Sequence, residues 1–413
     1  MSRIQRVQSV SLVVLAGFWL AGIQIYVAAN YLELDYPYTT YLFRPAHKFW
    51  DFFIPYAIAR DPYPAPGQLP HYTPGIEIGG TAMTAANVSG PAYFPVAYRI
   101  ISLFTLLPPI PALALFLIFS ILTFLILAQK HFQTANKLQT AQNVLILTLM
   151  SYPILFLLDR GNFEIIVFLC LYGFAILYES KPGWSAALLG IAIAMKATPA
   201  LLLLLLLRDR RWKLTLLTIL GVGLTTLAAY LSYPDGWRSL YHHYLNLTSS
   251  FSGYSIENNG LYFGHSLYGA IKFIVLWLMP TSDIEAFSRH FAIIYPLLSL
   301  SIAGLLLLWV WRSSVPFWQR LTILIGMMSL LPTVSADYKL IHFFIPLYLF
   351  INDPISTGRD RWYALAFGLL LIPKAFFHLQ SLPEVNSGVL LTPIIILGLL
   401  ATILLPKKEA LSS

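Results

Sequence analysis

Long apolar blocks separated by short polar and basic loops run along most of the chain. A block of about 20 apolar residues is long enough to cross the hydrocarbon core of a bilayer as one α-helix. The pattern therefore predicts an all-α, polytopic integral membrane protein, a single domain over residues 1–413 with about twelve transmembrane helices. The expected spans are residues 8–29, 110–129, 141–158, 163–178, 214–232, 290–311, 321–335, 340–352, 362–379 and 387–405.

Residues 184–207 form an apolar block with basic residues at both ends. Lys181 precedes the block and the basic segment 208–213 follows it, so the positive-inside rule places both ends on the cytoplasmic side. A single span cannot do this, but two short antiparallel half-helices can. Proline removes a helix hydrogen bond and favours an extended residue before it, so residues 196–199 are the expected break in a re-entrant-like pair. The alternative is one kinked helix whose lysine side chain reaches the membrane surface.

Two long loops are expected on the outer side, because the basic loops mark the cytoplasmic side. They are residues 30–109, the expected catalytic loop, and residues 233–281. Arg3 and Arg6 precede the first apolar block as in a signal sequence, and no small-residue cleavage site follows it. This pattern favours a retained signal anchor, with both termini cytoplasmic.

Composition narrows the class of protein. Hydrophobic residues make up 58% of the chain and charged residues 11%, whereas charged residues approach about a quarter of a soluble protein. Soluble enzymes, nucleic-acid-binding proteins and disordered scaffolds are therefore excluded. The net charge of +8 is mostly assigned to the loops that orient the spans, so no nucleic-acid partner is expected. The single cysteine, Cys170, allows no intrachain disulfide.

Ionisable residues at outer or intramembrane depth are the candidates for chemistry, because each is costly to insert into a membrane. Asp51 lies in the first outer loop among aromatic residues. Such surroundings raise the pKa of a carboxylate and suit a general base, and aromatic rings can stack on sugars. The alternative is an aspartate that caps a juxtamembrane helix.

Cationic side chains form the second group of candidates. Arg160 lies in an expected outer turn, and Lys196 lies at the break between the two half-helices. A guanidinium and an ammonium group near the membrane boundary suit a lipid-linked phosphate. Alternatively, Arg160 pairs with Asp159 or Glu164. His342, in the polar segment 335–342, either binds the same phosphate or caps an aromatic cluster.

Other site chemistries have no support in the sequence. His242 and His243 are adjacent and would diverge on a helix, so no metal site is expected. The chain has no Walker loop, dinucleotide fingerprint, zinc-protease motif or nucleophile elbow. No cofactor is therefore expected.

Several motifs resemble one family of membrane enzymes. They are the Arg160-Gly161-Asn162 run, the stretch 187–202 that contains Lys196 and Pro199, the basic segment 208–213, and the first-loop segment 51–63 with Asp51-Phe52, Tyr56-Ala57 and Asp61-Pro62-Tyr63. Together they resemble glycosyltransferase family 87, the polyprenyl-phosphate-mannose-dependent mannosyltransferases of the C-type (GT-C) membrane fold. The chain departs from the family pattern at 263–267, where His265 replaces an amide, and at 335–338.

The resemblance implies a reaction and a set of roles. A hexose, mannose in the family, would pass with inversion in one displacement from a polyprenyl-phosphate donor to a lipid or glycan acceptor. Asp51 would be the general base, and the donor phosphate would be bound by Arg160, Lys196, Lys339 and His342. The residues expected to contact the sugar or the acceptor are Trp50, Tyr56, Asp61, Tyr63, Asn162, Glu164 and His265.

A transporter or flippase for a lipid or small solute is the rival interpretation, with the same cations along a substrate path. Transporters usually carry broken helices in corresponding positions of two halves, and this chain has one broken pair only. Glycosyl transfer is therefore favoured. The expected location is the bacterial inner membrane, with the active site facing outward and membrane lipids around the spans.

Overall fold

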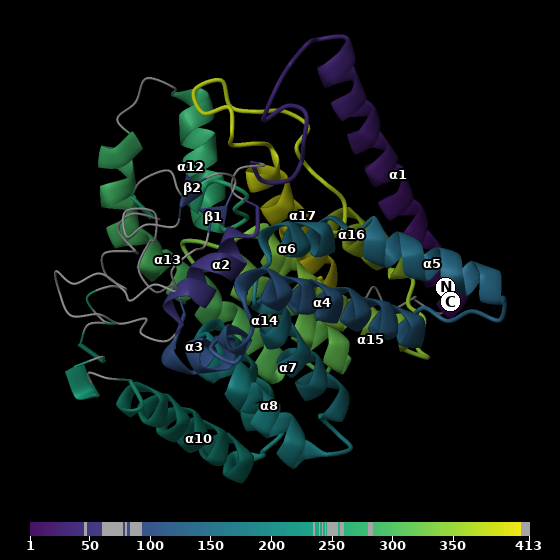
Figure 1. Ribbon diagram of the computed structural model, residues 1–413. Coiled ribbons are helices and arrows are strands. Elements are labelled where there is room, and N and C mark those ends of the chain that lie inside the picture. The colour runs from purple at the N-terminus through teal and green to yellow at the C-terminus, as the bar shows by residue number, and fades with distance from the viewer. Residues whose placement is uncertain are drawn as a thin grey trace, which may run out of the picture.

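The structure is a computed structural model that describes residues 1–44, 48–59, 77–78, 81–82, 93–233, 236–238, 240–241, 243, 245, 255–256, 260–279 and 284–405. The described residues form 16 α-helices, three short 3-10 helices and one two-residue strand pair, β1 (Glu77–Ile78) with β2 (Thr81–Ala82). The all-helical fold class is confirmed (Figure 1).

In chain order, the helices are α1 (Arg3–Asn30), α2 (Trp50–Ile58), α3 (Pro95–Ile101), η3 (Phe104–Leu106), α4 (Pro109–His131), α5 (Lys137–Leu149), α6 (Tyr152–Arg160), α7 (Glu164–Leu177), α8 (Pro182–Met195), η4 (Thr198–Leu202), α9 (Leu203–Arg208), α10 (Trp212–Leu231), α12 (Leu267–Leu278), α13 (Ile284–Arg312), α14 (Phe317–Leu330), η6 (Asp337–Phe343), α15 (Phe344–Asn352), α16 (Asp360–Leu370) and α17 (Gly388–Leu404).

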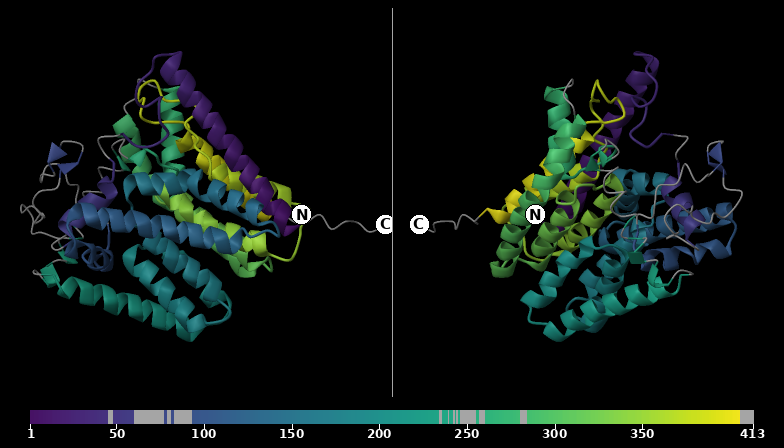
Figure 2. Two further views of the ribbon diagram at one scale, coloured as in Figure 1. Left: turned by 45° about the vertical axis from the view of Figure 1, so that its right-hand side comes forward. Right: turned by 90° about the vertical axis from the view of Figure 1, so that its left-hand side faces the viewer.

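The long helices at the edges enclose shorter helices in the centre. α10 packs on α8 and α8 on α7, whereas α1 packs on α16 and α16 on α17. Figure 2 shows α1 and α10 at opposite edges of the molecule. Between them α14 contacts α15, α17 and η4, and 12 of its residues are buried. By contrast, only 6% of the apolar window in α13 is buried, so this helix exposes an apolar surface that suits lipid.

Four of the described helices are long and apolar enough to cross a membrane: α1, α4, α10 and residues 286–312 of α13. A fifth candidate is the pair α5 and α6, which is bent by 50°. The expected number of about twelve spans is not shown. Apolar segments expected as separate spans form shorter helices of 9 residues in α15, 11 in α16 and 17 in α17. At about 1.5 Å per residue, α15 and α16 are too short to cross a bilayer alone, and the 17 residues of α17 reach about 26 Å of a hydrocarbon core of about 30 Å.

Arg6 and Arg208 form hydrogen bonds between helix termini at one end of the molecule, which we name the basic end. Arg6 Nε donates to the Asp360 carboxylate at 2.9 Å, which joins the starts of α1 and α16. Arg208 donates to the carbonyl of Ser313, which joins the ends of α9 and α13. Both contacts are made by residues in or next to the basic segments that the charge pattern assigns to the cytoplasmic side.

The segment after α8 returns toward the basic end. α8 ends at Met195, Lys196 is extended, and η4 and α9 follow. Tyr178, just after α7, donates its hydroxyl to the carbonyl of Leu205 in α9 at 2.7 Å. The end of α7 and the end of α9 therefore lie together, and Lys196 lies at the far end of α8. Its re-entrant placement in a membrane stays a prediction.

Candidate functional site

The candidate site lies at the ends of α7 and α8 that point away from the basic end. Four segments meet there: the start of α2, the turn between α6 and α7, the break after α8, and η6. They carry most of the ionisable residues that the sequence singles out.

The start of α2 is docked on the turn between α6 and α7. Phe49 is the N-cap residue, with a left-handed backbone, and its N–H donates to the carbonyl of Asp159 at 2.9 Å. Gly161 ends α6 with φ of +62°. A Cβ atom at this glycine would lie 2.8 Å from Cβ of Phe52, so the close approach of the two segments requires glycine.

Asp51 is held by two side chains from that turn. Arg160 forms an ion pair with one carboxylate oxygen, and Asn162 Nδ2 donates to the other at 2.8 Å. Arg160 thus pairs with Asp51, whereas the sequence suggests Asp159 or Glu164 as its partner. Asp51 lies in the first turn of α2, and the N-cap residue of this helix is Phe49. The guanidinium carbon of Arg160 also lies 4.1 Å from the centre of the Phe43 ring.

Glu164 forms a second buried cluster with two cationic or ionisable partners. Lys196 forms an ion pair with one carboxylate oxygen of Glu164, and His342 Nε2 lies 2.8 Å from the other. The carboxylate side chain is only 3% exposed. The structure therefore places Glu164 between two of the expected phosphate-binding residues rather than at an open surface.

Asn162 connects the two carboxylate clusters. Its side-chain oxygen accepts from the backbone N–H of Glu164 at 2.9 Å and from the hydroxyl of Tyr93 at 3.4 Å. Its amide nitrogen donates to Asp51 at 2.8 Å. The amide orientation is fixed by these partners, because an acceptor faces the N–H side and donors face the oxygen.

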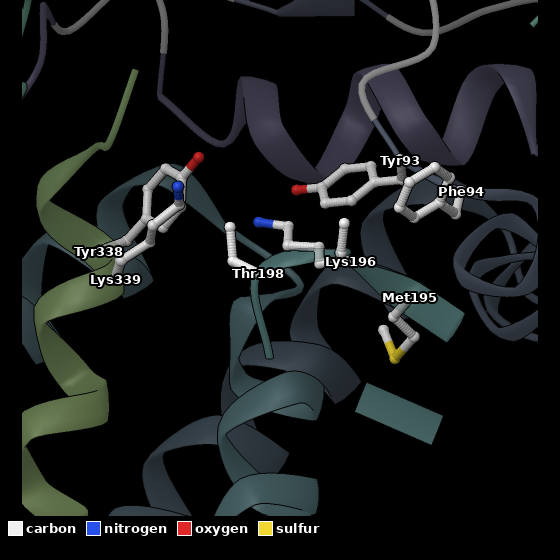
Figure 3. Close-up of a pocket in the computed structure, with 8 residues that line it drawn as sticks. Tyr93, Phe94, Met195, Lys196, Thr198, Tyr338 and Lys339 are labelled. Carbon is white, nitrogen blue, oxygen red and sulfur yellow. The ribbon is translucent and has the colours of Figure 1, made fainter. Parts of the chain in front are cut away.

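A cavity of about 260 Å³ opens beside the Glu164 cluster (Figure 3). Lys196 lies between two rings of its lining, with its ammonium 5.0 Å from the centre of the Tyr93 ring and 5.5 Å from that of Tyr338. Lys339 lies on the same wall as Tyr338. The remaining lining residues are Phe94, Met195, Ala197 and Thr198.

Lys339 has no carboxylate partner among the described residues. Its ammonium lies 3.5 Å from the carbonyl of Val334. Burial, reinforced by the positive charge of Lys196 and opposed by Glu164, lowers the pKa of Lys339 to about 8. This ammonium is therefore available to an anion that enters the cavity.

The structure brings seven of the predicted residues together, and these are Asp51, Arg160, Asn162, Glu164, Lys196, Lys339 and His342. Tyr56 and His265 are buried outside this group. Tyr56 donates to the carbonyl of Leu107 at 2.6 Å, and His265 contacts Asp337 and Ser335. Trp50 is half-buried on α2.

Two predicted residues, Asp61 and Tyr63, lie outside the described part of the chain. The sequence alone assigns no site role to Tyr93 or Tyr338, whose rings flank Lys196. The available signal is an aromatic residue beside a helix start or beside a lysine, which is too common in this chain to single out either one.

The chain matches the family described as Glycosyltransferase family 87 over residues 92–335. Comparisons with curated proteins and with solved structures give no match. The family match covers more than half of the chain and includes the turn from Arg160 to Glu164 and the break at Lys196. The chain therefore belongs to glycosyltransferase family 87.

Proposed function

We propose that this membrane glycosyltransferase moves a hexose, mannose by family resemblance, from a polyprenyl-phosphate donor to a lipid or glycan acceptor. Asp51 is the general base, and the cavity beside Lys196 and Lys339 receives the donor phosphate at the outward-facing end of the molecule. One observation carries the proposal: two lysines line one cavity, and Asn162 and Glu164 join that cavity to Asp51.

The charge of the site fits a phosphodiester. Arg160, Lys196 and Lys339 supply three positive charges, and Asp51 and Glu164 supply two negative charges. With His342 counted as neutral, the group carries one net positive charge. A polyprenyl-phosphate sugar carries one negative charge on its phosphodiester, so a bound donor neutralises the site. A diphosphate donor would leave an uncompensated negative charge in a partly buried site, which is costly.

The charge also balances during transfer. The acceptor oxygen attacks the anomeric carbon, and the bond from that carbon to the phosphate oxygen breaks with its electron pair on the phosphate. The acceptor proton passes to Asp51. The leaving phosphate monoester gains a second negative charge while Asp51 loses its own, so the fixed cations face a charge that develops in the transition state.

The hydrogen bonds of Asp51 are compatible with this role. A carboxylate has about four lone-pair sites, and Arg160 and Asn162 occupy one on each oxygen. The side chain is 21% exposed. A hydroxyl can therefore approach a remaining lone pair while the two partners hold the carboxylate in place.

The proposal is tested with purified full-length protein and three donor classes. We expect transfer from a polyprenyl-phosphate sugar and rates at least about tenfold lower from the matching diphosphate, since about 1.4 kcal/mol corresponds to tenfold. A nucleotide sugar without lipid carrier serves as the third donor. Product analysis by mass spectrometry, with mannose, glucose and galactose donors, identifies the sugar. Transfer from the nucleotide sugar alone would contradict the proposed donor class.

The lowered pKa of Lys339 predicts that donor binding depends on pH. Because its pKa lies near 8, the ammonium is charged below that pH and loses its proton above it. The donor phosphodiester keeps its charge throughout, so donor affinity should fall as the pH rises through about 8. Binding of a fluorescent polyprenyl-phosphate analogue measures this fall.

Two substitutions at the same position serve as controls. Lys339→Arg keeps its charge at every pH used and should remove the fall, whereas Lys339→Met should bind weakly with no step near pH 8. A step of the same size in the methionine variant would assign the titration to another group.

A further inference from the structure

A buried polar network lies directly behind the cavity wall that carries Tyr338 and Lys339. His265 Nδ1 lies 2.9 Å from Asp337 Oδ1, and His265 Nε2 lies 3.1 Å from the hydroxyl of Ser335. The side chain of His265 is fully buried and that of Asp337 is 5% exposed. None of these three side chains lines the cavity.

The backbone holds the same two segments together. Gly264 pairs with Ala336 in an antiparallel bridge. The N–H of His265 donates to the carbonyl of Ser335 at 2.8 Å, and the N–H of Asp337 donates to that of Phe263 at 2.9 Å. The segment before α12 is therefore fixed against the start of η6, and η6 continues into Tyr338 and Lys339.

Asp337 connects this pair to the helix that ends at Arg160. Its second carboxylate oxygen accepts from the hydroxyl of Tyr152 at 2.6 Å. Tyr152 begins α6, whose last residue is Arg160, and Asp337 begins η6, which also contains His342. One carboxylate thus fixes the relative position of the two elements that supply Arg160, Lys339 and His342.

The protonation of His265 follows from its surroundings. Burial lowers its pKa, so the ring is neutral near pH 7. A neutral imidazole has one N–H, and Asp337 can only accept, so Nδ1 donates to Asp337 and Nε2 accepts from Ser335. Both ring nitrogens are satisfied, and each has a different partner on the η6 side.

We propose that His265 is a positioning residue, which orients Asp337 and through it sets Tyr338 and Lys339 on the cavity wall. The part of this inference that concerns donor affinity rests on the proposed function; the placement of Lys339 does not. Without the imidazole, the buried Oδ1 of Asp337 loses the hydrogen bond from His265. The start of η6 then shifts, and small displacements of binding groups have large kinetic effects.

Three substitutions at His265 separate the contact with Asp337 from the contact with Ser335. Asn places its amide nitrogen near the position of Nδ1, so His265→Asn keeps a donor to Asp337. Gln reaches the position of Nε2, so His265→Gln keeps only the contact with Ser335. His265→Leu fills a similar volume and removes both.

The first measurement is independent of catalysis. An amine-reactive reagent labels the full-length protein in detergent, and peptide mass spectrometry gives the labelling rate of Lys339. Lys213, exposed at the basic end, is the internal control. We expect a change of at least about threefold at Lys339 in the Leu and Gln variants, little change in the Asn variant, and none at Lys213. A parent-like rate in the folded Leu variant, or equal changes at both lysines, overturns the inference.

The second measurement uses the transfer reaction. The Leu and Gln variants should raise the KM for donor about tenfold with kcat within about threefold of the parent, and the Asn variant should restore KM. Equal KM values for all three variants overturn the role in donor binding. If labelling changes as expected but no polyprenyl-phosphate donor supports transfer by the parent protein, the proposed function fails and the positioning role of His265 stands.

Discussion

Asp51→Asn should lower kcat at least about 1,000-fold, within the range attributed to a positioned general base. The amide keeps the size of the side chain and can still accept from Arg160, but it cannot take the proton of the acceptor hydroxyl. Donor affinity should be retained or increased, because Arg160 loses its carboxylate partner and the site gains one net positive charge. Steady-state transfer and direct donor binding measure the two effects separately.

Asp159→Asn is the matched control for this substitution. Asp159 lies next to Arg160, and its carboxylate accepts from the backbone N–H of Phe43 at 3.2 Å. An asparagine oxygen can accept the same hydrogen bond, so kcat should stay within about threefold of the parent. Full activity of the Asp51 variant, or an equal loss in both variants, would remove Asp51 from the role of base.

The sequence predicts the groups of the site better than their pairing. It singles out both Asp51 and Arg160, yet the partners that it suggests for Arg160 are the adjacent Asp159 and the nearby Glu164. The ion pair with Asp51 joins residues 109 positions apart. It depends on the docking of Phe49 on Asp159 and on the close approach at Gly161. Local spacing cannot reveal a contact that arises from the packing of two segments.

Hydropathy likewise predicts helices better than spans. It identifies apolar segments, but an apolar helix is compatible with lipid contact and with a protein core. The segments that form α14 and α15 are enclosed by other helices, whereas only 6% of the apolar window of α13 is buried. The all-helical class follows from the apolar pattern alone, whereas the number of candidate spans depends on helix length and on which helices surround each other.

Glu164 shows that the contacts of a single residue depend on segments far away in the sequence. A carboxylate in an expected outer turn is a reasonable ligand for a sugar hydroxyl. In the folded chain it is buried, with Lys196 on one oxygen and His342 on the other. The contacts span 32 and 178 positions of sequence. In the proposed function, Glu164 would therefore act on the donor phosphate through the lysine that it neutralises.

Lys196→Met should weaken donor binding about 100-fold, which corresponds to about 2.7 kcal/mol. Two causes act together. The cavity loses an ammonium that faces the phosphate, and Glu164 loses its ion-pair partner, so an unneutralised buried carboxylate now faces the bound anion. Donor affinity is measured with the same fluorescent analogue, and thermal unfolding in detergent checks that the variant is folded.

The double variant Lys196→Met/Glu164→Gln separates these causes. It removes the cation and the carboxylate together, so the site keeps the same net charge as the parent and no unpaired carboxylate remains. We expect it to recover about tenfold of the lost affinity and to remain weaker than the parent, because a direct contact with phosphate is still missing. Lys181→Met, at the exposed start of α8, is the control and should bind donor normally. Unchanged affinity in the single Lys196 variant would show that the cavity does not receive the phosphate, whereas full recovery in the double variant would mean that Lys196 only neutralises Glu164.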